Sequence, residues 1–388
     1  MTENLKPVKP GRLMSLDVFR GATIAGMLLV NNPGDWGNVF PPLLHAEWNG
    51  CTATDLVFPF FLFIMGVAMT FSFSKRSSTG SDRKALYGQI VRRTAILFVL
   101  GLIIMIFSWK GLQKEHFTPM GVLQRIALCY FFTSIIIMHT GIRGQFRWCI
   151  GLLGLHYILL KFVPFPGHEA GILEPYMNIS DWFDTKILGV HLGDFNKELG
   201  IGHDAEGLVG TISAIASTLA GVLCGHWLRN KETSGYEKVS GMAVMGTILL
   251  AIGLTLRYNI PFNKNLWTPS YVVYTTGWAL LSVCVCYWVI DIKGYKAWSK
   301  PFYVYGVNPI TAYFGASLMA YTSVWIRWEN AEGKTVMLKY FLYDHIYKSW
   351  VPDIFGNSIS SACWGMTYVI LWCALMWILY KKKIFIKV

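Results

Sequence analysis

The residues best suited to chemistry lie in one short stretch, His45 to Asp55, which runs directly into an apolar segment. The stretch contains an imidazole (His45), two carboxylates (Glu47 and Asp55), an indole (Trp48) and an amide (Asn49). The apolar run that follows is long enough to enter a bilayer. Polar groups are costly beside lipid, so a polar cluster at the mouth of a membrane helix usually has a function.

Each of these side chains has a chemical interpretation. His45 could act as a general base, because imidazole can accept a proton near neutral pH. Asp55 could hold the His45 tautomer or bind a substrate group, or it could simply be a carboxylate stabilised at a helix N-terminus. Glu47 remains an alternative base. Trp48 and Asn49 suit a sugar, since an indole covers a ring face and an amide binds hydroxyls.

The end of the first apolar segment supplies a further amide. Pro33 should stop this helix and leave Asn31 on its last turn, on the same side as His45. An amide there could donate to an oxyanion, or it could be only a helix end. Near the start of the same helix, Asp17 and Arg20 are three residues apart, which predicts a structural ion pair.

The elements that position these groups are membrane helices. Hydrophobic residues make up 54% of the 388 residues and charged residues only 14%, with a mean hydropathy of +0.42. We therefore expect an all-α polytopic membrane protein, with residues 1–388 forming a single domain. Windows of roughly 20 apolar residues predict about ten transmembrane helices, near 14–32, 52–73, 88–108, 120–139, 148–165, 207–228, 239–258, 269–290, 302–325 and 357–380.

The distribution of basic residues predicts the orientation. One set of connections, which includes both termini, holds about 19 Lys and Arg, and the other holds about 9. Both termini are therefore expected in the cytoplasm, with His45 on the opposite side. The longest connections on the His45 side, 164–206 and 326–356, are large enough to cover a cavity. The net charge of +12 follows from this bias and does not imply nucleic acid.

Basic groups elsewhere could bind a phosphate-rich ligand from the cytosol. The tail carries Lys382 and Lys387, although juxtamembrane lysines also serve as orientation signals and lipid contacts. Arg125 lies near the start of the fourth predicted helix, where an internal Arg must face the bundle.

Motifs of other enzyme classes are absent from the sequence. The eight Cys form no CxxC pair, and no HExxH is present, so we expect no metal. A Walker loop, a GxGxxG turn and a GxSxG elbow are also missing.

Eight sequence blocks, in order from residue 12 to the last residue, resemble the heparan-α-glucosaminide N-acetyltransferase family of membrane acyltransferases. One block departs from the family: Asp204-Ala205-Glu206-Gly207 stands where the family usually has Asp-Pro-Glu-Gly. The blocks are RLMSLDVFRG, VNNPGDWG, LLHAEWNGCTATDLVFPFFLFIMG, GVLQRIALCYF, EGLVGTISAIASTLAGVLCG, NKNLWTPSYVVYTTGWALL, YGVNPITAYFG and YKKKIFIKV.

The resemblance implies acetyl-CoA as the donor, approached from the cytosol, and an amino sugar as the acceptor on the other side. It places the catalytic histidine at His45 and a functional asparagine at Asn31. The compact chain looks like the bacterial branch, which implies the inner membrane with His45 facing the periplasm, and the family makes a homodimer plausible. Our further candidates are Asp55 for catalysis, Arg125, Asn308, Lys382 and Lys387 for coenzyme A, and Glu47, Trp48, Asn49 and Trp267 for the acceptor.

Three alternatives remain open. His45 could carry the acetyl group itself and give ping-pong kinetics, instead of acting as a base in direct transfer. The acceptor could be a hydroxyl of a cell-surface polysaccharide or peptidoglycan. The protein could also transport a sugar without chemistry, although such folds commonly show inverted repeats with paired broken helices, which the sequence does not display.

Overall fold

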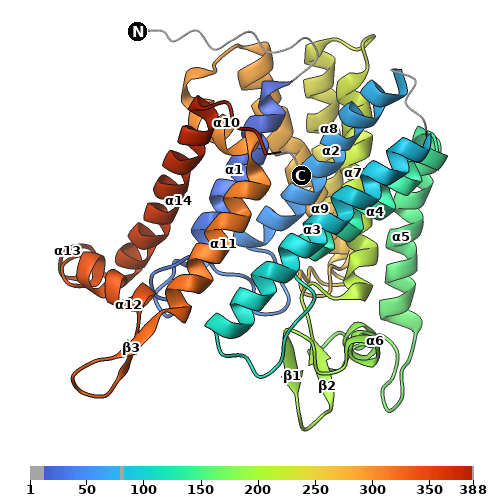
Figure 1. Ribbon diagram of the computed structural model, residues 1–388. Helices are drawn as coiled ribbons and strands as arrows, with labels where there is room; N and C mark the ends of the chain where they lie inside the picture. Colours follow the sequence, from blue (N-terminus) through green and yellow to red (C-terminus); the bar gives the residue numbers. More distant parts are fainter. Residues whose placement is uncertain (1–12, 79–82, 387–388) are drawn as a thin grey trace.

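The structure, a computed structural model, describes residues 13–78 and 83–386 and shows a helical bundle with two short β-hairpins (Figure 1). The fold is that of an all-α polytopic membrane protein. The α-helices are α1 (Met14–Asn31), α2 (Val57–Ser78), α3 (Arg83–Gly111), α4 (Val122–His139), α5 (Ile142–Phe162), α6 (Ile179–Leu188), α7 (Leu208–Arg229), α8 (Gly235–Leu256), α9 (Pro269–Cys286), α10 (Lys300–Val307), α11 (Pro309–Trp325), α12 (Leu338–Tyr343), α13 (Val351–Phe355) and α14 (Asn357–Lys381).

Seven helices within the described residues are long and apolar enough to cross a membrane. They correspond to α2, α3, α4, α7, α8, α9 extended to Ile292 by a π-helical turn (Tyr287–Ile292), and α14. The other three predicted windows fall on α1, on α5 and on the pair α10 and α11. The window at 302–325 was expected to be one helix. It is interrupted at Asn308, because Pro309 lacks the N–H that would continue the helix.

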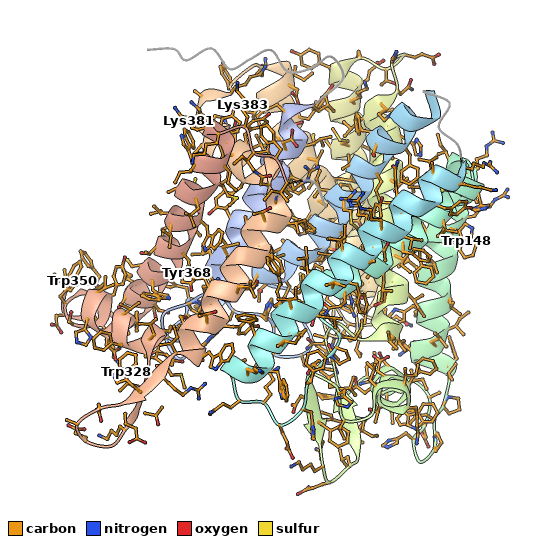
Figure 2. The ribbon with its side chains drawn as sticks, in the orientation of Figure 1. Trp148, Trp328, Trp350, Tyr368, Lys381 and Lys383 are labelled. Atoms are coloured by element: carbon orange, nitrogen blue, oxygen red, sulfur yellow. The ribbon has the colours of Figure 1, made fainter. Side chains whose placement is uncertain are left out.

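The two long connections lie at the same end of the bundle, opposite to the start of α1 (Figure 1). The first contains α6 and the hairpin of β1 (Asp194–Asn196) and β2 (Ile201–His203). The second contains the hairpin of β3 (Arg327–Glu329) and β4 (Thr335–Met337), followed by α12 and α13. Figure 2 shows Trp328 and Trp350 at this end and Lys381 and Lys383 at the other.

Close helix packing in the centre depends on glycine. A Cβ atom at Gly66 of α2 would lie 2.0 Å from the backbone oxygen of Thr218, and one at Gly221 of α7 would lie 1.9 Å from that of Phe63. Small residues let membrane helices approach each other in this way, since burial of apolar surface cannot drive helices together in lipid. The α2–α7 pair therefore forms a rigid centre.

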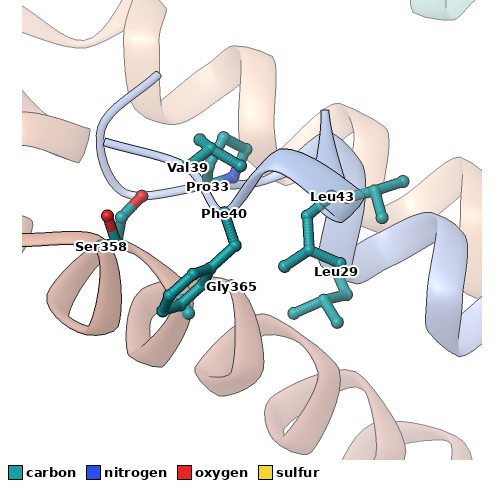
Figure 3. A pocket seen from close by; sticks show the side chains of 10 residues that line it. Leu29, Pro33, Val39, Phe40, Leu43, Ser358 and Gly365 are labelled. Carbon is teal, nitrogen blue, oxygen red and sulfur yellow. The ribbon is translucent and has the colours of Figure 1, made fainter. Parts of the chain in front are cut away.

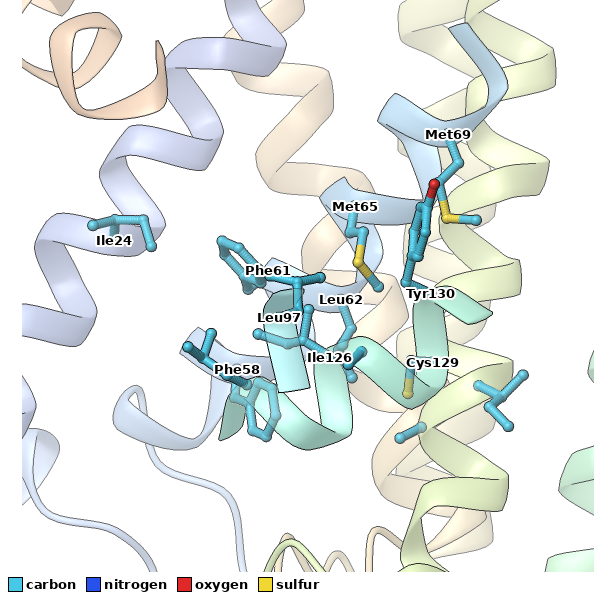
Figure 4. Packing of buried hydrophobic residues seen from close by; sticks show 14 of the residues in the cluster. Ile24, Phe58, Phe61, Leu62, Met65, Met69, Leu97, Ile126, Cys129 and Tyr130 are labelled. Atoms are coloured by element: carbon cyan, nitrogen blue, oxygen red, sulfur yellow. The ribbon is translucent and has the colours of Figure 1, made fainter. Parts of the chain in front are cut away.

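The largest apolar cluster surrounds α2 (Figure 4). Phe61 and Leu62 of α2 pack with Leu97 of α3 and with Ile126 of α4, and all four are almost fully buried. This packing fixes the start of α2, which carries the polar stretch identified in the sequence.

Candidate active site

His45 and Asp55 form a hydrogen-bonded pair. The Nδ1 atom of His45 lies 2.6 Å from Oδ1 of Asp55. The Asp55 side chain is only 1% exposed, whereas that of His45 is 44% exposed. A proton on Nδ1 would be held by the carboxylate, which leaves Nε2 as the accessible basic atom.

The Asp55 carboxylate is fixed by its local turn. Its Oδ2 atom accepts hydrogen bonds from the backbone N–H groups of Ala46 and Thr52 and from the Thr52 hydroxyl, at 2.9–3.1 Å. The turn is a 3₁₀-helix (Thr54–Leu56) that leads into α2. On α9, the Tyr271 hydroxyl donates to the Asp55 carbonyl at 2.5 Å. The carboxylate therefore has a single position from which to orient the imidazole.

Lys264, which our sequence interpretation did not select, lies beside the His45 ring. Its Nζ atom is 3.5 Å from Nδ1 and 3.3 Å from Nε2. Since these distances are nearly equal, the amine lies alongside the ring and not in line with one nitrogen lone pair. Burial lowers the pKa of Lys264, and the charges of Glu206 and Asp55 oppose that shift. The only signal in the sequence was its place in the block NKNLW.

The connection between α8 and α9, which carries Lys264, is tied to the His45 stretch at two further points. The Asn263 amide donates to Oδ1 of Asn49 at 3.2 Å. The N–H of Gly50 donates to the carbonyl of Phe262 at 2.7 Å. Asn49 therefore has a structural partner, and the two loops form one unit.

The loop that leads to His45 is anchored on α14 (Figure 3). The Ser361 hydroxyl donates to the Asp35 carbonyl at 2.9 Å and accepts from the Asp35 N–H at 3.0 Å. Phe40 and Gly365 line a small pocket between this loop and α14. His45 is thus positioned from both sides by distant parts of the chain.

Trp48 is committed to other protein groups. Its indole N–H donates to the carbonyl of Leu173 at 2.8 Å, and its ring meets the His203 ring edge-on at 5.0 Å. His203 in turn lies 2.6 Å from Asp181. Trp48 therefore joins the His45 stretch to the first long connection. Its side chain is half-buried, so only part of the indole surface is open to solvent. Glu47 is exposed.

Asn31, the last residue of α1, lines a cavity of about 450 Å³. Aromatic side chains from α11 and α14, including Tyr313 and Tyr368, form much of its wall, and Glu206 also lines it. His45 is not among the described residues that line this cavity. Glu206 connects the two regions electrostatically, because its charge acts on Lys264.

Two buried carboxyl groups, Asp184 in α6 and Asp204 after β2, belong to the first long connection. Burial raises the pKa of Asp184 to about 7, although Oδ1 accepts the N–H groups of Leu208 and Val209 at the start of α7. Burial and the neighbouring Glu206 raise the pKa of Asp204 to about 6. Asp204 lies on the wall of the Asn31 cavity, so this wall carries a carboxyl group whose pKa is raised by burial and by Glu206.

Trp267 and Arg125, which the sequence interpretation assigns to ligand contacts, lie in the core. Trp267 is 0% exposed, and its N–H donates to the Ser217 hydroxyl at 3.1 Å. The Arg125 guanidinium, also 0% exposed, lies 5.0 Å from the Trp267 ring centre and donates to the Gly207 carbonyl at 2.9 Å.

Asn308, which the sequence interpretation assigns to coenzyme A, contacts other protein groups here. It is fully buried at the break between α10 and α11, and its amide binds the C-terminal tail. The amide donates to the carbonyl of Ile384 at 2.9 Å and accepts the N–H of Ile386 at 2.9 Å. Lys382 is exposed at the end of α14, opposite to the His45 end. Lys387 lies outside the described residues, so the predicted coenzyme A contacts do not form one cluster among those that are described.

The described residues contain no group of three or more His, Cys, Asp or Glu side chains arranged to hold a metal ion.

Comparison with known proteins finds similarity to one enzyme family. Residues 12–198 match the family model described as heparan-alpha-glucosaminide N-acetyltransferase, catalytic. The chain is 29% identical to the human heparan-alpha-glucosaminide N-acetyltransferase over 98% of this chain and 60% of the relative. It is 28% identical to the mouse protein over 97% of this chain and 60% of the relative.

The matched region contains Asn31, His45 and Asp55, whereas Lys264 lies beyond it. The chain spans 60% of the length of the curated relatives it matches. Residues 12–198 are therefore similar to the catalytic region of the heparan-alpha-glucosaminide N-acetyltransferases, and the similarity to curated members extends over nearly the whole chain.

Proposed function

We propose that the protein transfers an acetyl group from acetyl-CoA to the amine of a glucosamine-type sugar, with His45 as the general base. The observation that carries this proposal is the His45–Asp55 pair, in which a buried carboxylate holds Nδ1 and leaves Nε2 exposed. We choose a glucosamine-type amine as the acceptor because the relatives are named as N-acetyltransferases of a glucosaminide.

In the proposed reaction the amine nitrogen attacks the thioester carbon. The C–N bond forms, the C–S bond breaks, and coenzyme A leaves as the thiolate. The amine reacts as the free base, since a protonated amine has no lone pair for the attack. His45 Nε2 takes the proton that the nitrogen gives up as the C–N bond forms and can pass it to the thiolate. Asp55 stabilises the imidazolium that forms between these two proton transfers.

The negative charge that develops on the thioester oxygen needs a donor. The Asn31 amide, on the wall of the 450 Å³ cavity, is one candidate. The Lys264 ammonium is the other, since it already lies within 3.5 Å of the imidazole. A thioester is an activated acyl group, so these groups suffice for the chemistry that we propose.

We place the site in the bacterial inner membrane, with both termini in the cytoplasm and His45 facing the periplasm. The excess of Lys and Arg in the connections at the other end supports this orientation. Acetyl-CoA would then enter from the cytosolic side, and the acceptor from the side of the two long connections.

Thiol release in detergent tests the proposal. The purified protein is mixed with acetyl-CoA and a panel of amino sugars, and the panel includes a hydroxyl acceptor that lacks an amine. We expect release only with the amines, and we expect His45→Ala to abolish it while coenzyme A still raises the melting temperature. His345→Ala, which removes another exposed imidazole, should keep its activity.

Other outcomes would reject specific parts of the proposal. Turnover in His45→Ala would remove the mechanism. Release with the hydroxyl acceptor would indicate O-acetylation, and sugar binding without thiol release would indicate transport. Labelled acetyl trapped on His45 without an acceptor would favour the acetyl-imidazole route.

A further inference from the structure

An apolar groove on the outside of the bundle, remote from His45, has the features of a lipid site. It has a volume of about 940 Å³, within the range of ligand pockets. Its walls come from α5 and α8, and its floor comes from α7 and α9. Wall residues such as Ile150 and Val244 are exposed, while floor residues such as Cys224 and Val272 are buried. The groove is therefore open to the hydrocarbon and closed toward the core.

The basic residues of the groove are two arginines near the start of α5. Arg143 and Arg147 are four residues apart and lie on the same face of the helix. Neither guanidinium has a carboxylate within salt-bridge distance in the described part of the chain. Trp148, labelled in Figure 2, marks this end of α5.

The helix pairings place the arginines at one end of the groove. The Gln145 side chain of α5 accepts a hydrogen bond from His226 near the end of α7, at 2.8 Å. The neighbouring Trp227 packs on Gly241, near the start of α8. Interfacial Trp is typical of the headgroup level in membrane proteins. The end with Arg143 and Arg147 is therefore the headgroup end.

The depth of the groove matches one lipid leaflet. Along α5 it extends from Ile142 to Leu153, and eleven residues of α-helix rise about 16 Å. The hydrocarbon core of a bilayer is about 30 Å thick, so each leaflet contributes about half. Apart from the arginines, the lining is apolar except for Thr276 and Cys side chains.

We infer that this groove binds an anionic phospholipid, with its acyl chains between α5 and α8 and its phosphate on Arg143 and Arg147. Guanidinium groups favour phosphate because they donate paired, charge-assisted hydrogen bonds. A zwitterionic lipid would fill the same groove but would gain less from the two positive charges.

Native mass spectrometry of the detergent-solubilised full chain tests this inference. The probes are dioleoyl phosphatidylglycerol and dioleoyl phosphatidylcholine. We expect preferential retention of phosphatidylglycerol, and the double variant R143Q/R147Q should weaken its binding roughly 10-fold, toward the level of phosphatidylcholine. The double variant K161Q/R257Q removes two charges from the opposite ends of α5 and α8, and it should keep the preference.

A second variant tests the apolar part. Val273→Trp should fill the floor of the groove and weaken the binding of both lipids, whereas Ile370→Trp, on an exposed face of α14, should not. Elution volume in detergent checks that each variant is folded.

Three results would overturn the inference. R143Q/R147Q could retain phosphatidylglycerol as well as the unchanged protein does. Soluble glycerophosphoglycerol could displace the lipid, which would show that the headgroup alone binds. R143Q/R147Q could also convert a dimer to a monomer without a change in lipid retention per chain, which would assign the groove to a second copy of this protein.

Discussion

The imidazole Nδ1 of His45 is held 2.6 Å from the Asp55 carboxylate, and the other oxygen of that carboxylate accepts three further hydrogen bonds. Asp55 is thus a positioning residue, because it acts on the reaction through His45. The arrangement leaves the imidazole one orientation, with Nε2 accessible. The first two predictions concern this site.

Asp55→Asn should lower kcat by roughly 100-fold, the typical contribution of a well-placed general base. The asparagine amide has no charge to stabilise the imidazolium. Its NH₂ group would also face hydrogen-bond donors, either the Nδ1–H of His45 or the groups of Ala46 and Thr52. The KM for acetyl-CoA should change little. Asp344→Asn, which alters an exposed carboxylate near Lys348, is the control. An unchanged kcat in Asp55→Asn would show that His45 does not need this partner.

Lys264→Met should lower kcat roughly 100-fold if its ammonium is the donor to the thioester oxygen. Lys264→Arg should restore part of the loss, because the positive charge is kept. Lys161→Met, a change of the same kind on α5, should have no effect. A loss in Asn31→Ala with normal turnover in Lys264→Met would assign the oxyanion donor to the amide instead.

Asp184→Asn should make the protein more stable, and by more at pH 8 than at pH 5. The pKa of Asp184 is raised to about 7 in the folded state and is near 3.9 when unfolded. Between these values the folded state binds more protons, so stability falls as the pH rises toward 7. The asparagine oxygen can still accept the N–H groups of Leu208 and Val209. Melting curves in detergent at the two pH values should differ by an amount on the order of 1 kcal/mol, and an equal effect at both would contradict the assignment.

Trp267→Ala should destabilise the fold by about 3–5 kcal/mol, the usual cost of truncating a buried aromatic side chain. It would also remove the ring that lies over the Arg125 guanidinium. Trp350→Ala, at a half-exposed site, should cost far less. If Trp267 contacted the acceptor, the truncation would instead raise the acceptor KM at normal stability.

Asn308→Ala should release the tail from the break between α10 and α11. Both hydrogen bonds to Ile384 and Ile386 would be lost, and their backbone groups would need new partners, at about 1–3 kcal/mol. Limited proteolysis should then cut the tail faster than in the unchanged protein, while Asn330→Ala, on an exposed hairpin, should leave the rate unchanged. A higher KM for acetyl-CoA without faster cleavage would restore the predicted role in coenzyme binding.

The sequence by itself determined where the long apolar helices lie and where the polar stretch lies, but not the short helices α6, α12 and α13 within the two long connections. Hydropathy windows depend on local composition, and nine of the ten each fall on one helix of the structure, whereas the window 302–325 falls on the pair α10 and α11. The end of α1 at Asn31 and the Asp17–Arg20 ion pair, 3.1 Å between Oδ1 and Nη1, were also predicted correctly. These features arise within a few residues, where proline geometry and helical spacing decide the outcome.

Only the tertiary structure decided which distant groups meet. Lys264 reaches His45 across 219 positions, and the tail folds back to occupy the Asn308 amide. The sequence interpretation assigns Trp267 to sugar binding, but helix packing buries its ring beneath the Arg125 guanidinium. A sequence pattern reports how apolar a segment is and which residues share a face. The choice of neighbour depends on how helices separated by hundreds of residues pack, and that information is not local.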